Sequence, residues 1–293
     1  FHMIIANSYM KGLAMNRWII LGTIILLSGG AWWLWQENPQ LHSDVMAYLQ
    51  NGEILTLESK YTPDYIMEQK RSVLLQDNTR TYQEPSLSYY PYLLMDVKFT
   101  QNDKRPKEAQ VLWSLVDGEI VINTDTWEKT HGFADAMLAK ANKDDFKILN
   151  ILGKNRGTTT IEQIVKELHL DSAVVEPWIQ STIDKHLVVR NGNQVHLYFE
   201  NPKLAVYPQT KFTKNLVKKP YNQLIKVSQK FTRNEIEKIA KAAFGNDFTI
   251  RAVKEVFLPV FNIKILNGDG SIHTSDWNSI NGQRMDQELI SKL

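Results

Sequence analysis

The spacing of apolar residues predicts three helices in the middle of the chain. Apolar side chains recur at intervals of three and four residues, which places them along one face of a helix. This pattern covers the ranges 145–152, 161–168 and 174–183. Thr160 and Ser172 stand before the second and third helices, where a side-chain oxygen accepts hydrogen bonds from the first free backbone N–H groups. We therefore expect each of them to be an N-cap.

A β-hairpin is predicted directly after the third helix. Two apolar runs, 187–190 and 194–199, flank the turn residues Asn191-Gly192-Asn193. Asn-Gly is a strong signal for a two-residue hairpin turn, because both residues accept positive φ angles. The pattern thus predicts three helices followed by two short antiparallel strands.

A second pattern occurs twice, once on each side of these helices. Residues 54–66 and 224–236 align without a gap, with apolar residues at four matching positions and a shared Lys, Thr and Ile. Thr62 and Thr232 stand at matching places, where a helix N-cap belongs. A Pro follows the first at the N1 position, and a Glu three residues after the second completes a capping box. Two ways of starting the same helix indicate a diverged duplication.

The likeness continues through two further pairs of stretches. Residues 89–98 match 256–264, and residues 113–118 match 277–282, with a Trp at the start and a Gly at the end of the latter pair. The two tryptophans are expected in the core rather than as ligand platforms. Each copy therefore predicts a helix followed by an antiparallel meander of about three strands. Two unrelated hairpins that share turn residues are the alternative.

One stretch near the N-terminus is apolar throughout. Residues 18–35 carry no charge, and eighteen helical residues at ~1.5 Å each extend about 27 Å, close to the ~30 Å apolar core of a bilayer. Tryptophans bracket this run and match a membrane-interface belt; they are Trp18, Trp32, Trp33 and Trp35. We predict a transmembrane anchor at 18–36 after a tail at 1–17. A cleaved signal peptide and a buried helix are the alternatives, but the run lacks a clean Ala-x-Ala site.

Charges on the two sides of this run predict its orientation. Lys11 and Arg17 precede it, whereas Glu37 and Asp44 follow it. Because cytoplasmic flanks are enriched in Lys and Arg, the N-terminus is expected in the cytoplasm and the body on the periplasmic or extracytoplasmic side. The lipid bilayer is then the first expected partner, through residues 18–36.

Three helices followed by a hairpin resemble a winged helix-turn-helix module. The resemblance covers residues 143–201 and rests on the order of these elements and on the residues Ile-Asp-Lys-His-Leu-Val-Val-Arg at 183–190. The family usually binds DNA, and its fold is also used for protein contacts or as a spacer. Its geometry implies a protein-contact surface on the third helix and the wing, made of Glu176, Trp178, Gln180, Asn191 and Asn193.

Charge decides between the two kinds of partner. A DNA-reading helix presents Arg, Lys, Asn or Gln on a basic background that contacts phosphates. Between residues 143 and 200 there are seven Lys and Arg against eight Asp and Glu, so no basic face is expected. We favour a protein partner or self-association. If the module binds nucleic acid instead, the expected contacts are Lys185, Arg190, Lys218 and Lys219.

The second copy of the duplicated pattern resembles a PepSY unit. It has an Asp-Gly turn at 269–270 and a late Asn-Gly turn at 281–282, as in that helix-plus-three-strand family. The first copy lacks the Asp-Gly turn. The resemblance implies PepSY-like units at 52–123 and 222–287. Most members of the family act outside the cytoplasm as inhibitory or binding modules, which implies the same role for this chain.

Composition narrows the chemistry. The 293 residues leave room for two or three small domains, the net charge of +2 argues against general affinity for nucleic acid, and the absence of cysteine excludes disulfides and thiolate metal sites. The seven histidines are scattered along the chain, and no Ser has a nucleophile-elbow context, so no catalytic, metal or cofactor site is expected. The lysine-rich linker at 202–221 is predicted to be a solvated connector, with contact to anionic lipid or another polyanion as the alternative.

These patterns predict an α+β protein with an N-terminal transmembrane helix and two α-β-β-β units that bracket a winged helix. We expect a non-enzymatic, membrane-anchored scaffold or regulatory interaction module. The alternative is a membrane-tethered transcription regulator whose body lies in the cytoplasm and binds DNA.

Overall fold

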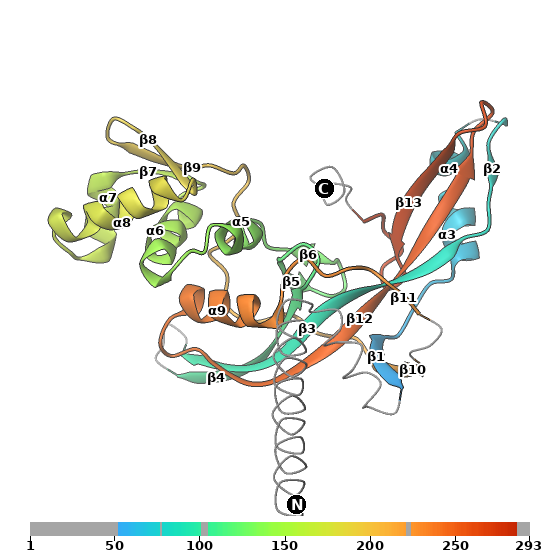
Figure 1. The fold of residues 1–293 in the computed structure, drawn as a ribbon, viewed down its shortest axis with the longest axis horizontal. Helices are drawn as coiled ribbons and strands as arrows, with labels where there is room; N and C mark the ends of the chain where they lie inside the picture. The colour runs from blue at the N-terminus through green and yellow to red at the C-terminus, as the bar shows by residue number, and fades with distance from the viewer. Residues whose placement is uncertain (1–51, 77, 101–104, 221–223, 286–293) are drawn as a thin grey trace, which may run out of the picture. The chain divides into compact units, whose positions relative to one another are not determined.

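The computed structural model describes residues 52–76, 78–100, 105–220 and 224–285 (Figure 1). The chain divides into two compact units, 1–51 and 52–293, and the described residues all belong to the second. This unit has an α+β fold in which helices pack on a curled mixed sheet. Among the described residues, no helix is both long and apolar enough to cross a bilayer. The predicted anchor at 18–36, with Trp18, Trp32, Trp33 and Trp35, lies outside the described residues.

The main sheet has the strand order β10-β1-β12-β3-β4-β5-β6. Its strands are β1 (Glu53–Leu57), β3 (Ser86–Thr100), β4 (Pro106–Ser114), β5 (Ile120–Asn123), β6 (Glu128–Lys129), β10 (Leu216–Pro220) and β12 (Thr249–Leu266). Further strands pair at its ends: β2 (Thr81–Tyr82) and β13 (Ile272–Asn278) with β12, and β11 (Ile225–Lys226) with β3. We refer to residues 52–130 as the first half and residues 224–285 as the second half.

The long strands β3 and β12 form the spine of the sheet and run antiparallel across Figure 1. Tyr90 pairs with Leu258, and these two residues hold matching places in the duplicated pattern. The register is therefore symmetrical about this pair. Side chains in the middle of both strands are buried on both faces, so the sequence there is continuously apolar instead of alternating.

The short first strand of each half joins the long strand of the other half. Thr56 of β1 pairs in parallel with Phe257 of β12, and Lys226 of β11 pairs in parallel with Tyr89 of β3. Thr56 matches Lys226 in the aligned sequences, and Phe257 matches Tyr89. The two strand pairings between halves thus occur at the same position of the duplicated pattern. Each half contributes a short strand to the sheet beside the long strand of the other half.

The helices that follow these strands are α3 (Pro63–Gln69) with α4 (Arg71–Leu75) in the first half and α9 (Arg233–Phe244) in the second. The predicted N-caps are confirmed: the backbone N–H of Tyr65 donates to Thr62 (3.3 Å), and that of Glu235 donates to Thr232 (3.2 Å). The Glu235 carboxylate accepts from Thr232 N–H in return and closes the predicted capping box.

Each helix packs on the hairpin of the other half, as Figure 1 shows for α3 beside β13 and α9 beside β4. Ile66 of α3 packs with Ile263 and Trp277 of the β12–β13 hairpin. Ile236 of α9 belongs to the same core as Trp113 of β4. Both tryptophans are buried, as predicted.

The middle of the chain forms a helical insertion, residues 131–201. Its elements are α5 (Phe133–Leu138), α6 (Lys143–Lys154), β7 (Thr158–Thr160), α7 (Ile161–Leu168), α8 (Ser172–Asp184), β8 (Val188–Asn191) and β9 (Gln194–Leu197). The three predicted helices are confirmed as α6, α7 and α8, and Thr160 caps α7. A third strand, β7, which the pattern did not indicate, joins the hairpin in the order β7-β9-β8.

Two local predictions in the insertion are wrong by one residue. The N-cap of α8 is Asp171, whose backbone is extended, so Ser172 is the first helical residue. The hairpin turn is formed by Gly192 and Asn193, because Asn191 pairs with Gln194 and stays in the strand. Gly192 has a φ of +61°, which suits the first central position of a two-residue hairpin turn.

The insertion shares its core with the sheet. The Phe133 ring of α5 lies 5.1 Å from the Trp113 ring of β4 and 6.0 Å from the Phe146 ring of α6, measured between centroids. Phe244 of α9 lies 6.0 Å from Phe133 on the same side. The insertion therefore packs on both halves through a continuous aromatic cluster, on Trp113 of the first half and on Phe244 of the second.

The lysine-rich linker at 202–221 is not a solvated connector. It begins beside the insertion, where Leu204 is buried, and ends in β10, which pairs with β1. Between them, residues 203–216, which we name the strap, cross the first half of the sheet. Phe212 and Leu216 pack on the sheet face opposite α9. The strap's apolar residues and its backbone bonds to strands hold it in place although it is rich in lysine.

Candidate functional site

The predicted contact residues of α8 do not share one surface. Trp178 is half-buried and faces α6, where the Lys147 ammonium lies 4.0 Å from its ring centroid. Glu176 points toward the β8–β9 hairpin, which we call the wing, and forms an ion pair with Arg190. Residues 176 and 178 are two positions apart, so they lie on different sides of the helix.

The remaining predicted contacts lie toward the wing. Gln180 donates a hydrogen bond to Asp184 one turn along α8 (2.8 Å). Asn193 at the tip of the hairpin bonds to the Glu162 carboxylate of α7, and Asn191 is exposed beside it. Glu176, Gln180, Asn191 and Asn193 thus surround the outer side of α8 and the wing, without Trp178.

Lys185, one of the residues assigned to nucleic acid, is engaged inside the insertion. Its ammonium forms an ion pair with Asp145, which is fully buried in the first turn of α6. The same carboxylate accepts from the Ser181 hydroxyl (2.8 Å) and from the Asn142 backbone N–H (2.7 Å). Lys185 therefore joins α8 to α6, and Ser181 is half-buried for the same reason.

The other three basic residues also have partners. Arg190 pairs with Glu176, as described above. Lys218 Nζ lies 3.1 Å from the Glu53 carboxylate, and Lys219 bonds to the Tyr89 hydroxyl (3.4 Å). The structure does not gather these four cations into one phosphate-binding surface: two belong to the insertion and two to β10.

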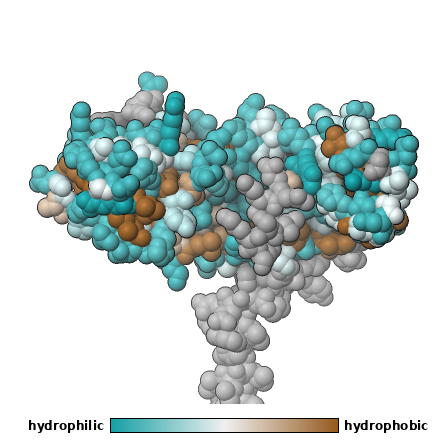
Figure 2. Space-filling model, turned by 90° about the horizontal axis from the view of Figure 1, so that it is seen from above, coloured by the Kyte–Doolittle hydropathy of each residue, from teal (hydrophilic) through white to brown (hydrophobic). Residues whose placement is uncertain are grey.

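Apolar side chains are exposed near the outer end of α8 instead. Leu170 precedes the helix and is 39% exposed, Val174 in its first turn is 44% exposed, and Val189 of the wing is 46% exposed. Figure 2 shows hydrophobic side chains among hydrophilic ones on the side of the molecule that holds the insertion. Scattered apolar residues are common on surfaces, but Leu170 and Val174 stand at the start of α8, and Val189 belongs to β8, which contacts α8.

A second candidate, which sequence reasoning missed, lies on the sheet face opposite α3. The Ser88 hydroxyl donates to the Asn262 side-chain oxygen (2.6 Å), and the Asn262 amide donates to Asp276 (2.5 Å). The other oxygen of Asp276 accepts from the Tyr90 hydroxyl (2.9 Å). Burial and, next, the charge of Asp276 raise the pKa of the Tyr90 phenol well above its usual range. Tyr90 therefore stays a donor, and the four groups form a fixed polar network.

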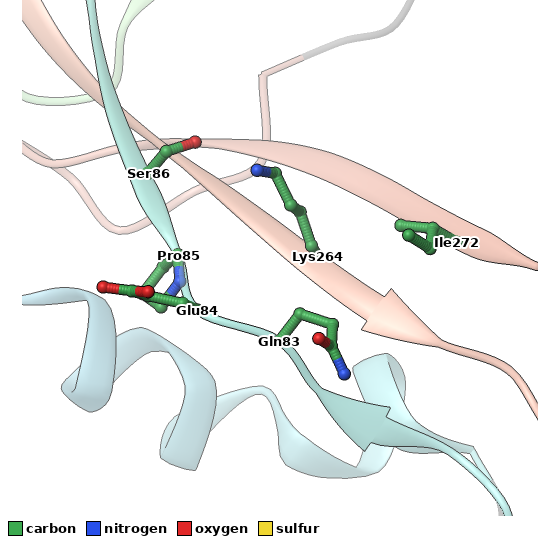
Figure 3. Close-up of a pocket in the computed structure, with 6 residues that line it drawn as sticks. All are labelled: Gln83, Glu84, Pro85, Ser86, Lys264 and Ile272. Carbon is green, nitrogen blue, oxygen red and sulfur yellow. The ribbon is translucent and has the colours of Figure 1, made fainter.

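The two halves differ at this face. On the face that the strap covers, the matching positions are apolar and buried; they are Leu94 and Leu112 of the first half and Val256 of β12. The strap covers that face, whereas the second half presents a hollow of about 460 Å³ beside the network. Figure 3 shows its lining, with Lys264 on β12 pointing toward Ser86 on β3. The signal for this difference is visible in the aligned sequences as polar residues at apolar positions.

The buried carboxylate of Glu119 has a structural role, because its hydrogen bonds join two segments of the fold. It accepts hydrogen bonds from the Thr130 hydroxyl (2.7 Å) and from the backbone N–H groups of Gly132 and Ala134 (3.0 Å each). These bonds tie the end of the first meander to the start of α5. Burial raises the pKa of Glu119 above its usual range, although the hydrogen bonds oppose the shift.

This shift predicts a pH-dependent loss of stability that Glu119→Gln removes. With its pKa raised on folding, Glu119 binds a proton more tightly in the folded than in the unfolded chain. Its contribution therefore falls as pH rises above the unfolded value of about 4.5. Urea unfolding of both proteins from pH 4 to 8 is expected to favour the Gln variant increasingly. Parallel curves, or an equal effect of the exposed-site control Glu128→Gln, contradict this account.

Thr210 of the strap binds where β4 and β5 separate. Its backbone N–H donates to Gln110 O (2.6 Å), and its hydroxyl accepts from Leu112 N–H (2.8 Å) and donates to Val121 O (2.5 Å). Leu112 and Val121 are partners in the strand ladder. The hydroxyl therefore stands between them and replaces one direct bond of the pair.

We expect Thr210→Val to lower the free energy of unfolding by about 1–3 kcal/mol, because it leaves a buried N–H and a buried C=O without a partner. Thr210→Ser keeps the hydroxyl and should cost less than about 1 kcal/mol. Urea unfolding of the two variants measures the difference. A larger loss in Thr210→Ser than in Thr210→Val would assign the role of Thr210 to its methyl group, and equal losses would contradict the dominant role of its hydroxyl.

Comparison with known proteins finds no match for this chain: no family model matches it, and no curated protein or solved structure resembles it significantly. Among the described residues there is also no cluster of three or more His, Cys, Asp or Glu arranged to hold a metal ion. The candidate sites therefore rest on the geometry of the chain itself.

Proposed function

We propose that this chain is a non-enzymatic, membrane-anchored interaction module in which two related, PepSY-like units bracket a winged helix that binds a protein. The run at 18–36 would be the anchor, and the charges around it favour an extracytoplasmic body. The matching strand exchanges of the two halves support a duplication. The succession of α6, α7, α8 and a three-stranded β-sheet supports the winged-helix interpretation.

The observation that carries the proposal is the character of α8 and the wing. Their basic residues, Lys185 and Arg190, are bound by carboxylates of the insertion itself. A nucleic-acid surface gains its affinity from cations that are free to replace counterions on phosphates. Exposed Val174 and Val189 beside neutralised charges fit a protein partner better.

A photo-crosslinking amino acid at position 174 in the full, membrane-inserted chain tests this proposal. We expect one defined adduct, with another protein or with a second copy, that is lost when Val189→Glu is added. A probe at Val73 of α4, which is also exposed, is the matched control. No adduct at position 174, or the same adducts at both positions, contradicts the proposal.

The competing function is a membrane-tethered transcription regulator with a cytoplasmic body. It requires retention of DNA at low salt that declines steeply as salt rises, and we expect none. A topology reporter fused after Leu293 tests the orientation separately. A cytoplasmic signal together with salt-sensitive DNA retention would replace our proposal with this one.

A further inference from the structure

The two halves of the sheet carry the same backbone arrangement at the edge that Thr210 occupies in the first half. Trp277 bridges to Arg284 as Trp113 pairs with Ile120, and Met285 N–H donates to Asp276 O (2.8 Å). Asp276 and Met285 thus correspond to Leu112 and Val121. Thr274, two residues before Asp276, corresponds to Gln110.

In the second half this arrangement has no Thr210. Among the described residues, nothing bonds to Asp276 N–H or to Met285 O, although these two groups belong to the same pair. Thr274 O, two residues earlier in the strand, faces the same side of β13. Within the part of the chain that the structure describes, residues 272–276 of β13 pair only with β12, apart from the contact to Met285. The edge therefore presents an acceptor (Thr274 O), a donor (Asp276 N–H) and a second acceptor (Met285 O). The three matching groups of the first half are all bound by Thr210.

We propose that this edge of β13 is a docking site for an extended peptide segment of a partner protein, held by a serine or threonine. The residue's N–H would donate to Thr274 O, and its hydroxyl would accept from Asp276 N–H and donate to Met285 O. Strand edges bind peptides through such main-chain bonds, with side chains adding specificity. This site lies on the sheet and does not depend on the winged helix.

The neighbouring face decides which peptide fits. In the first half, Phe212 follows Thr210 by two positions and packs on an apolar face. In the second half the same face carries the network of Asn262 and Asp276 and the hollow beside Lys264. A polar side chain two residues after the serine or threonine matches it, whereas a phenylalanine there would cover polar groups without bonding to them. The backbone bonds expected for the peptide are therefore those that the strap makes in the first half. The side chain two positions after the serine or threonine must differ, because the second half presents a polar face there.

The probe is a synthetic peptide that copies residues 207–213 with Gln in place of Phe, Tyr-Pro-Gln-Thr-Lys-Gln-Thr, together with a version in which Val replaces the Thr that matches Thr210. Amide hydrogen exchange of the full chain reports the site. In the free protein, the Asp276 N–H should exchange at least tenfold faster than the Leu112 N–H. Addition of the Thr peptide should slow exchange at Asp276, and the Val peptide should bind at least tenfold more weakly.

Two variants at one position separate backbone from side-chain recognition. Thr274→Pro keeps Thr274 O but places the proline ring where the N–H pointed away from β12, so the ring blocks strand addition at this edge, and proline is tolerated at such edge positions. It should abolish peptide binding, whereas Thr274→Val keeps both backbone groups and should retain it. If the proline variant fails to fold, the Thr and Val peptides still decide.

Each contrary result overturns the proposal. Protection of Asp276 N–H equal to that of Leu112 in the free protein means that the edge is already filled. Equal binding of both peptides, no binding at millimolar concentration, or loss of binding in Thr274→Val excludes the hydroxyl-and-backbone mode. None of these outcomes affects the crosslinking test of Val174, so the two proposals fail separately.

Discussion

Replacing Gly118 with alanine is expected to destabilise the protein by about 3 kcal/mol, whereas the same change at Gly282 should cost about 1 kcal/mol. The two glycines hold matching places at the ends of the two hairpins. Both have positive φ, +76° at Gly118 and +68° at Gly282, so the strain that alanine introduces into the backbone is similar. The difference comes from the side chain above each turn.

The turn at Gly118 is the more tightly packed of the two, because the Phe231 ring of the second half lies against it. A Cβ at Gly118 would lie 2.7 Å from the Phe231 ring and 2.6 Å from the end of Met137. At Gly282 the nearest atom would be in the Tyr61 ring, at 3.4 Å, an ordinary contact. Met137 is flexible at its end, but Phe231 is buried and its backbone N–H donates to Leu115 O (3.0 Å). The ring therefore has little room to move.

Equilibrium urea unfolding of both alanine variants measures this difference. Equal losses would mean that the Phe231 ring moves freely and that the backbone conformation alone determines the cost. A larger loss at Gly282 would contradict the packing of the first hairpin as described.

Asp145→Ala is expected to lower stability by about 3 kcal/mol, with its effect concentrated in the helical insertion. The change removes the N3 partner of the α6 capping box and leaves Lys185, whose side chain is 26% exposed, beside a buried gap. Ser181 loses its acceptor as well. Removing one partner of a buried pair costs more than the pair contributes, because the remaining charge stays desolvated.

Asp144→Ala is the matched control for this prediction. Asp144 is the neighbouring residue, its side chain is 44% exposed, and its pair with Lys147 spans one helical turn. Such pairs contribute only a few tenths of a kcal/mol. Hydrogen exchange should show faster opening of α6 and α8 in Asp145→Ala, with α3 and β13 unchanged. Uniform loss across the molecule would show that the insertion and the sheet unfold as one unit.

If both predictions hold, the molecule combines a rigid sheet, in which each half closes the other, with an insertion stabilised by its own polar network. The proposed winged-helix contact and the proposed peptide edge would then lie on separate elements. A partner bound at one would leave the other accessible.

Local chemistry explains which features the sequence by itself determined. The N-caps at Thr62, Thr160 and Thr232 depend on residues within one helical turn, and all three are confirmed. The helices of the insertion follow from apolar spacing for the same reason. Even the errors at Ser172 and Asn191 are shifts of a single residue.

Only the tertiary structure decided how the two halves combine and what the linker does. The Thr56 hydroxyl donates to Phe257 O (3.0 Å) across 201 residues of sequence, and no periodicity in either segment encodes that choice of partner. The sequence around Thr210 predicted a solvated lysine-rich segment. The structural role of Thr210 depends on bonds to two strands that lie 89 and 98 residues earlier in the chain, so the local sequence does not reveal it. Spacing along the chain reports which face of an element is apolar, but which face of another element covers it depends on non-local packing.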